Sequence, residues 1–93
     1  MSEHKVLVPL ATGFEEVEAI TIIDLLRRAE IPVTTAALDG REVLGAHGVV
    51  VQADFTWEEL DEAEITAIVL PGGMPGATNL RDDRRVLSMV ERL

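Results

Sequence analysis

Two short apolar segments constrain the fold more than any other feature of this chain. Residues 6–10 read VLVPL, and residues 65–70 read ITAIVL. Continuous apolar runs of this length are typical of strands that are covered on both faces, as in parallel sheets. Each run leads into a glycine-containing loop and then into a segment with helical spacing of apolar residues. Because strand–helix–strand connections build parallel sheets, the pattern predicts an α/β fold.

The segments around the two runs predict the remaining elements. A helix is predicted over residues 15–29, because Thr12 and Glu15 have capping-box spacing and Pro32 follows the helix end. Residues 33–38 are predicted to form a strand, since the first three side chains are β-branched. The other predicted elements are a hairpin over 42–44 and 49–52, helical turns over 56–60, and a helix over 82–93. Thr56 and Glu59 have the spacing of a second capping box at the start of the helical turns.

The predicted order of elements stops one strand short of a finished sheet. The chain ends on a helix, where this type of fold returns to the sheet with a strand. Segment 65–70 also carries no charge or bulge signal that would protect it as a sheet edge. We therefore expect one domain over residues 1–93 that is incomplete at its C-terminal side.

Composition excludes several classes of function. With 17 acidic and 8 basic residues the formal net charge is −9, which argues against binding to a nucleic-acid backbone. No membrane span or signal peptide is expected, because no long apolar run is present, and a cytoplasmic protein is the default expectation. The chain has no cysteine, and hence no disulfide or thiol nucleophile of its own. His4 and His47 have no companions at ligand spacing, so no metal site is predicted.

Three glutamates lie within four positions at the start of the first predicted helix. Glu15 falls in the first turn, where free N–H groups and the capping box explain a carboxylate. On a helical wheel Glu16 lies at the border of the apolar arc, where a solvated first-turn acid is expected. Glu18 lies inside the apolar arc, between Leu25 and Ala29. Glu18 is therefore the anomaly among the three.

The position of Glu18 has two explanations. In the first, the carboxylate turns to solvent or bonds a nearby backbone group. In the second, it lies beneath the carboxyl ends of the strands, where open α/β sheets bind ligands. There a partly desolvated carboxyl group is held protonated and donates a hydrogen bond to an anionic partner. Both explanations remain open from the residues alone.

The loop at 71–79, PGGMPGATN, is the second candidate for chemistry. It lacks the Gly-Lys-Ser/Thr of a P-loop and does not fit GxGxxG. Tandem glycines permit positive φ and a close approach to backbone N–H groups. The loop is either a backbone anion site at the sheet's carboxyl edge or a plain strand-to-helix turn. Arg27 and Arg28 are expected to be solvated cations that complement the helix dipole, with a subunit contact as the alternative.

Three segments together resemble a known family: VLVPLATGFEEVEAITIIDLLRRAEIPVTTAAL, GVVVQAD in the hairpin, and AIVLPGGMPGATNLRDD. In this order, and over essentially all 93 residues, they are similar to the DJ-1/PfpI (ThiJ) superfamily, in particular its DJ-1/YajL branch. GFEEVEA and LPGG with a downstream GA-x-NL are specific in combination. The resemblance implies a flavodoxin-like (class I glutamine amidotransferase-like) three-layer sandwich with a parallel sheet.

The resemblance also implies a function and site residues. Family members are described as cofactor-free, cysteine-dependent glyoxalases or deglycases and as stress-responsive chaperones, with small carbonyl compounds or glycated groups as substrates. The glutamate matching Glu18 contacts the cysteine sulfur, and backbone N–H groups matching Gly73, together with Gly72, form an anion pocket. The first helix is implied to join a homodimer contact. The residues expected in that contact are Val17, Ile20, Asp24 and Arg28.

The chain departs from the family pattern at the nucleophile. The family's elbow, an alanine-rich strand that ends in Ala-Ile-Cys, would begin just beyond Leu93. One hypothesis is the N-terminal half of a DJ-1-type enzyme, which needs a C-terminal complementing half for covalent cysteine chemistry. The other is a non-catalytic half-domain that associates through segment 65–70 or through the first helix. A chain that is only marginally folded alone is a third hypothesis.

Overall fold

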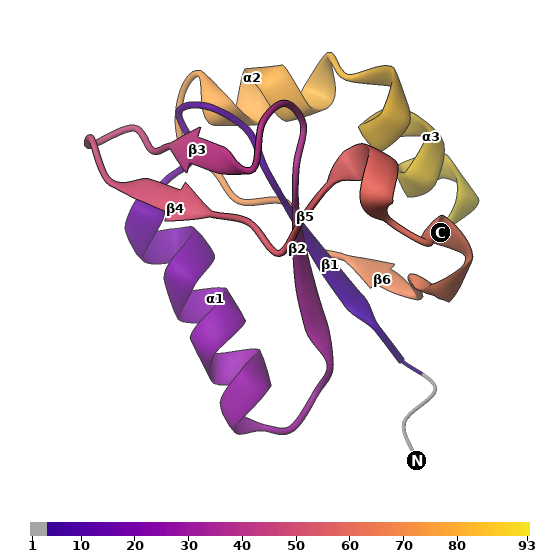
Figure 1. Cartoon of the computed structure of the whole chain (residues 1–93). Helices are drawn as coiled ribbons and strands as arrows, with labels where there is room; N and C mark the ends of the chain where they lie inside the picture. Colours follow the sequence, from indigo (N-terminus) through magenta and orange to yellow (C-terminus); the bar gives the residue numbers. More distant parts are fainter. Residues whose placement is uncertain (1–3) are drawn as a thin grey trace.

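A parallel sheet of four strands forms the centre of the computed structural model, in the order β5-β2-β1-β6 (Figure 1). The structure describes residues 4–93. The first three residues, which belong to the N-terminal segment where no signal peptide is expected, lie outside the described residues. The strands of the sheet are β1 (Val6–Leu10), β2 (Val33–Ala37), β5 (Phe55–Thr56) and β6 (Ala67–Ile68). The predicted parallel α/β fold is confirmed.

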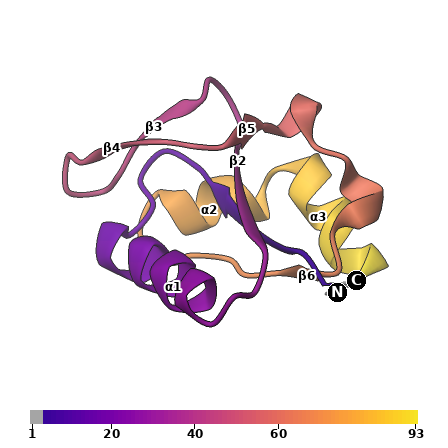
Figure 2. The ribbon, with the colours of Figure 1, turned by 60° about the horizontal axis from the view of Figure 1, so that its bottom comes forward.

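Helices cover both faces of this sheet, which gives the fold three layers (Figure 2). Helix α1 (Glu16–Arg28) lies on one face, and α2 (Gly76–Arg81) and α3 (Arg84–Arg92) lie on the other. Two 3-10 turns, η1 (Trp57–Glu59) and η2 (Glu62–Glu64), connect β5 to β6. Within residues 4–93, no helix combines the length and the apolar character that crossing a membrane requires.

The predicted hairpin is confirmed as a separate antiparallel unit. Strands β3 (Glu42–Leu44) and β4 (Val50–Gln52) pair with each other and do not join the main sheet. The hairpin lies on the α1 side of the sheet, where Val43 packs in the same apolar cluster as Phe14 and Ile23. This placement brings the turn of the hairpin to the start of α1.

Strand β1 organises both apolar cores because successive side chains of a strand point to opposite faces. Leu7 belongs to the cluster with Val86 and Met89 of α3. Val8 belongs to the cluster with Ile23 of α1. All five residues of β1 are buried, so the prediction that this strand is covered on both faces is confirmed.

Two capping predictions had different outcomes. The box predicted from Thr12 and Glu15 is wrong, because Glu15 is itself the N-cap of α1 and its side chain accepts a hydrogen bond from the Val17 N–H. At η1 the predicted pair is present, and the Thr56 N–H donates to Glu59 Oε1 at 2.8 Å. The first helix itself begins and ends within one residue of its predicted bounds.

Segment 65–70 is the main departure from the predicted fold. A strand covered on both faces was expected, but β6 contains only two residues, and Leu70 is 47% exposed. Within the described part of the chain, β6 pairs with β1 alone, through Val6↔Ala67 and Leu7↔Ile68. The sequence is apolar enough for a central strand, but β6 lies at the edge of the sheet.

Candidate functional site

The glycine loop after β6 lies against the start of α1, so the two segments singled out in the sequence meet. The Gly72 N–H donates to Glu18 Oε1 at 2.7 Å, across 54 residues of chain. In the other direction, the Glu15 N–H donates to the Gly72 carbonyl at 2.9 Å. These two bonds position Glu18 beside Gly72.

The side chain of Glu18 is exposed, which differs from its predicted place among apolar residues. The buried side of α1 is instead formed by Glu16, Ala19 and Ile23, and Leu25 is 60% exposed. The buried face predicted by the helical wheel therefore differs from the face that packs on the sheet. The reason is that apolar residues occupy more of the surface of α1 than the sheet covers. Glu18 faces solvent and bonds a backbone group, as in the first of its two explanations, although that group is distant in sequence.

Gly73 has the positive φ that the tandem glycines predict. Its φ is 94°, and a Cβ there would lie 2.6 Å from the Glu15 nitrogen and 2.8 Å from the Gly13 oxygen. Only glycine fits such a position without displacing backbone. The N–H of Gly72 is already bonded to Glu18, so of the two predicted anion-pocket groups the Gly73 N–H is the better candidate.

A second polar cluster joins the start of α1 to the turn of the hairpin; we call Glu15, Glu16 and His47 the His47 clasp. Glu16 Oε2 accepts hydrogen bonds from the backbone N–H groups of His47 at 2.7 Å and Val49 at 3.2 Å. Glu16 Oε1 lies 3.0 Å from His47 Nδ1. A side chain on Gly45 would overlap Glu16, so glycine permits this close approach.

The prediction that Glu16 is a solvated acid is wrong. Only 8% of the residue is exposed, because the hairpin folds over the first turn of α1 and covers the border of its apolar face. Burial by itself would raise the pKa of Glu16. Hydrogen bonds from the His47 side chain and from backbone N–H groups outweigh burial and lower that pKa to about 2.

His47 acquires two carboxylate neighbours that its sequence spacing did not indicate. Besides Glu16, Glu15 Oε1 lies 3.7 Å from Nδ1 of the imidazole. The hydrogen bond to Glu16 raises the pKa of His47, and the charges of Glu15 and Glu16 add to the effect. The three candidate ligand atoms lie within 4.8 Å of one another. Because Glu16 already accepts two backbone N–H bonds and faces the imidazole, we interpret the cluster as a hydrogen-bonded clasp. The expectation of no metal site stays a prediction.

The residues expected at a dimer contact lie on the exposed side of α1. Val17 is 74% exposed, Ile20 is exposed as well, and Asp24 and Arg28 form a surface ion pair at 3.0 Å. Arg27 is exposed, as expected of a solvated cation, and its side chain pairs with Asp54 at 3.0 Å. Exposed apolar side chains also occur on the neighbouring hairpin, at Val49 and Val50.

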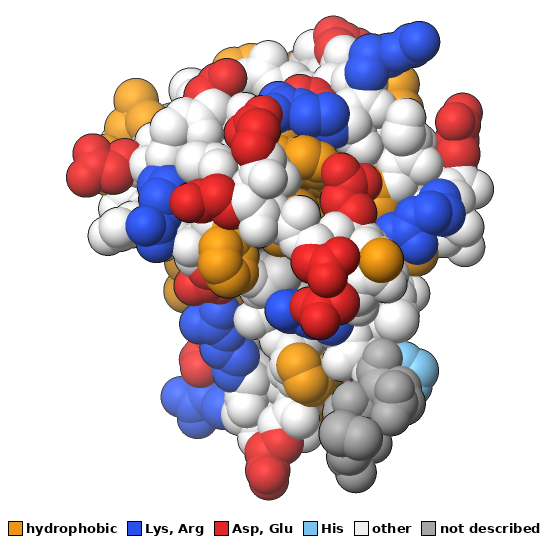
Figure 3. All heavy atoms as spheres, turned by 45° about the vertical axis from the view of Figure 1, so that its right-hand side comes forward, with side chains coloured by type: hydrophobic (Ala, Val, Ile, Leu, Met, Phe, Trp, Pro, Cys, Tyr) orange, Lys and Arg blue, Asp and Glu red, His pale blue; other side chains and the backbone are white. Residues whose placement is uncertain are grey.

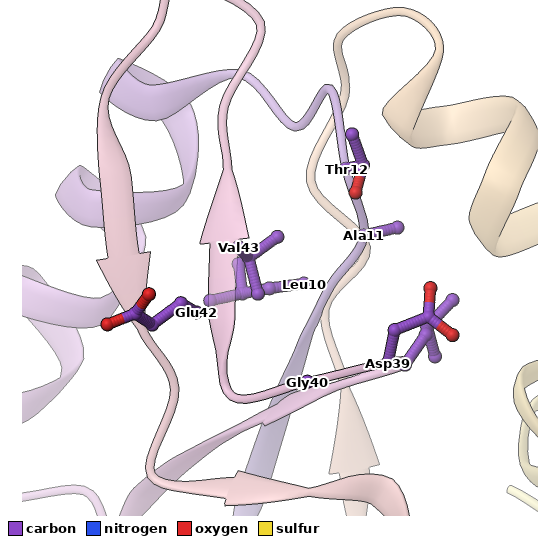
Figure 4. Close-up of a pocket in the computed structure, with 8 residues that line it drawn as sticks. Leu10, Ala11, Thr12, Asp39, Gly40, Glu42 and Val43 are labelled. Carbon is purple, nitrogen blue, oxygen red and sulfur yellow. The ribbon is translucent and has the colours of Figure 1, made fainter.

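An apolar groove of about 300 Å³ is lined in part by the glycine loop. Its lining residues come from the end of the β6 segment and from α2 and α3, and they are Leu70, Pro71, Gly72, Ala77, Leu80, Arg81, Val86, Leu87 and Val90. A pocket at the carboxyl ends of β1 and β2, lined by Thr12 and Asp39 among others, has only about 20 Å³ (Figure 4). That volume suits a water molecule rather than a substrate.

The surface around the α3 side mixes charges of both signs with apolar side chains. Figure 3 shows acidic, basic and apolar groups interspersed on this face. An ion-pair network contributes there, since Arg85 bonds Asp83 at 2.8 Å and Glu58 at 2.7 Å. The face shown in Figure 3 presents separate charges rather than one continuous basic patch.

Comparisons with known proteins show which family this chain is similar to. The family model described as "DJ-1/PfpI family" matches residues 4–93. Protein DJ-1 homolog B of Arabidopsis thaliana is 38% identical over 89 residues, which are 95% of this chain and 20% of that protein. A deglycase of Thermococcus kodakarensis is 36% identical over 69 residues, or 74% of this chain and 42% of that protein.

Solved structures show the same likeness. The oxidized DJ-1 of Toxoplasma gondii superposes with a TM-score of 0.90 at 43% identity, and the match covers 96% of this chain and 49% of that one. The flavodoxin-like fold implied by the resemblance is thereby confirmed. The chain spans half or less of the length of these relatives. Its fold, its family model and its relatives all place this chain in the DJ-1/PfpI family.

Proposed function

We propose that the chain is the N-terminal half of a cysteine-dependent, cofactor-free DJ-1/PfpI-type enzyme. Its substrates are small carbonyl compounds or glycated groups, and its role is protection against carbonyl or oxidative stress, with chaperone-like activity as a family trait. The observation that carries the proposal is the contact between Glu18 and Gly72 at the sheet's carboxyl edge. The name of the Thermococcus relative, a deglycase, supports the substrate class.

Each site group has a distinct role in this proposal. A cysteine on a complementing segment would lie beside Glu18, and its thiolate sulfur would attack an aldehyde carbon to form a carbon–sulfur bond. The carbonyl oxygen then carries the negative charge, and the Gly73 N–H donates a hydrogen bond to it. The Glu18 side chain would hydrogen-bond the sulfur and so position it.

The free edge of β6 and the groove beside α3, which we together call the open side, support the need for a complementing half. Strand β6 pairs only with β1 among the described strands, and the groove beside it is lined mainly by apolar side chains. A returning strand could pair with the free edge of β6 through backbone hydrogen bonds. A helix from the same segment could bury Leu87 and Val90, which are exposed in this chain.

Complementation tests the proposal. The chain is assayed for methylglyoxal turnover alone and together with a C-terminal segment that bears the elbow cysteine. We expect turnover only with both, and a loss of about 100-fold or more when Glu18→Gln is introduced. Glu91→Gln, at an exposed position of α3, is the matched control. Substantial turnover by the 93-residue chain alone, lost in Glu18→Gln, would contradict the cysteine mechanism.

A second candidate function is association without catalysis. Exposed apolar side chains on α1, Val17 and Ile20, and on the hairpin, Val49 and Val50, favour it, because the His47 clasp joins the two elements. We refer to these four residues as the apolar patch. Two copies could bury this patch in a two-fold homodimer. Light scattering should then detect a dimer that Val17→Asp dissociates and that Val90→Asp, in the groove, leaves intact. A stable monomer would contradict this candidate.

A further inference from the structure

The turn between β3 and β4 is fastened to the start of α1 by bonds that cross about thirty residues of chain. Glu16 provides the side-chain part, with one oxygen for two backbone N–H groups and the other for the His47 ring. Two backbone bonds of 2.8 Å complete the junction, from the Gly13 N–H to the Leu44 carbonyl and from the Ala46 N–H to the Phe14 carbonyl. The turn of the hairpin is therefore fastened at this junction, in addition to the packing of Val43 in the apolar cluster.

His47 is the member of this junction whose charge changes near neutral pH. Among the described residues, the charged groups that face its Nδ1 are Glu16 at 3.0 Å and Glu15 at 3.7 Å. Its side chain is 69% exposed, so the ring exchanges protons freely with solvent. A protonated ring makes a charge-assisted hydrogen bond to Glu16, which is stronger than the bond from a neutral ring.

We propose that His47 is a pH-responsive latch, which holds the β3–β4 hairpin against α1 when the ring is protonated and loosens it when the proton is lost. The latch also acts on the apolar patch described above, because Val17 lies on α1 whereas Val49 and Val50 lie on the hairpin. This second consequence rests on the proposed association, but the motion of the hairpin does not.

The direction of the effect follows from the electrostatics of the cluster. The hydrogen bond to Glu16 and the charge of Glu15 raise the pKa of His47 from 6.5. A group with a raised pKa in the folded state stabilises that state fully below its unfolded value and loses the effect as pH rises through the folded value. The latch is therefore closed below pH 6.5 and opens as pH rises above that value.

Amide hydrogen exchange of the chain, followed by NMR, tests the latch. Protection of the Val49 amide is measured relative to that of Thr35 in β2, at pH values from about 6 to about 8.5. We expect this ratio to fall several-fold with rising pH. In His47→Gln, which keeps a polar side chain without titrating, the ratio should stay constant, whereas His4→Gln should retain the transition. An equal response in His47→Gln, or none in the unmodified chain, overturns the proposal.

A second measurement does not depend on any variant. The ring resonances of His47 and the amide resonances of the hairpin are titrated in the unmodified chain. We expect one shared midpoint above the ordinary histidine value, because one proton controls both. Hairpin resonances that fail to titrate with the ring overturn the latch.

Sedimentation at the same pH values separates the latch from the association. We expect the dimer dissociation constant to increase as pH rises in the unmodified chain and to stay constant in His47→Gln. If the hairpin titrates while the chain is monomeric at every pH, the latch stands and the proposed association fails. If a dimer forms but neither it nor the hairpin responds to pH, the association stands and the latch is overturned.

Discussion

The two sides of the sheet differ in whether segments of this chain cover them and pair with their polar groups. On the α1 side, the hairpin covers the helix start, and Glu16 pairs with backbone groups of the turn. On the α3 side, β6 is the sheet edge and Leu70 and Leu87 are exposed beside a groove of about 300 Å³. On the first side the polar groups of the helix start are paired within the chain, whereas the groove on the second side is suited to receive another segment.

The glycine loop lies between these two sides, and its substitution should have the largest effect. Gly73→Ala places a Cβ 2.6 Å from the Glu15 nitrogen at a φ of 94°, so we expect a loss of at least about 2 kcal/mol in unfolding free energy. Urea denaturation measures it.

Two other glycines separate the causes of this loss. Gly48 has a φ of 87° with nothing within 4 Å of a built Cβ, so Gly48→Ala should cost only the backbone part, about 1 kcal/mol. Gly40→Ala has neither problem and should be close to neutral. Equal losses in Gly73→Ala and Gly48→Ala would show that close packing of the loop on α1 contributes nothing.

Substitution of Glu16 should destabilise the α1 side of the sheet, where the His47 clasp lies. Glu16→Gln replaces an acceptor oxygen that serves two N–H groups and removes the charge, so the melting temperature at neutral pH should fall clearly. Because the pKa of Glu16 is lowered to about 2, its stabilisation is present above the ordinary value of 4.5 and is lost as pH falls toward 2. Glu16→Gln should therefore lose less stability across that range than the parent chain or Glu91→Gln does.

Removing the N-cap side chain of α3, on the open side, should have a smaller effect on stability. Asp83 is the N-cap of α3 and accepts hydrogen bonds from the Arg85 and Val86 N–H groups. Asp83→Ala should cost about 1 kcal/mol in unfolding free energy, and Asp83→Asn about half of that. The side chain of Arg85 lowers the pKa of Asp83, so this contribution also declines in acid. A cost above that of Gly73→Ala would reverse the proposed ranking.

Exposed apolar residues on the open side should matter least for the folding of this chain. Leu87→Ser should change the unfolding free energy by no more than about 0.5 kcal/mol, because the side chain is already exposed. Its effect should appear instead in binding of a complementing segment, measured by calorimetry. Val17→Ser, on α1, should leave that binding unchanged. Equal effects of the two variants on binding would contradict the assignment of the open side as the docking side.

Local patterns were sufficient where they involve neighbours in sequence. Helix α1 lies within one residue of its predicted bounds, and the Thr56–Glu59 pair forms as its spacing predicts. The glycines after β6 predicted a positive φ, which Gly73 adopts. These features depend on backbone sterics and on hydrogen bonds within a single turn, and the residues themselves encode both.

Contacts between distant segments could not be predicted in the same way. The wheel ranked Glu18 as buried and Glu16 as solvated, and the packed structure has the reverse, because the covering hairpin comes from thirty residues further along the chain. His47 appeared isolated for the same reason. The sequence by itself determined the parallel α/β order, the glycine loop and the family. Only the tertiary structure decided which glutamate is buried and which partner His47 has, because burial depends on the segments that pack against a helix.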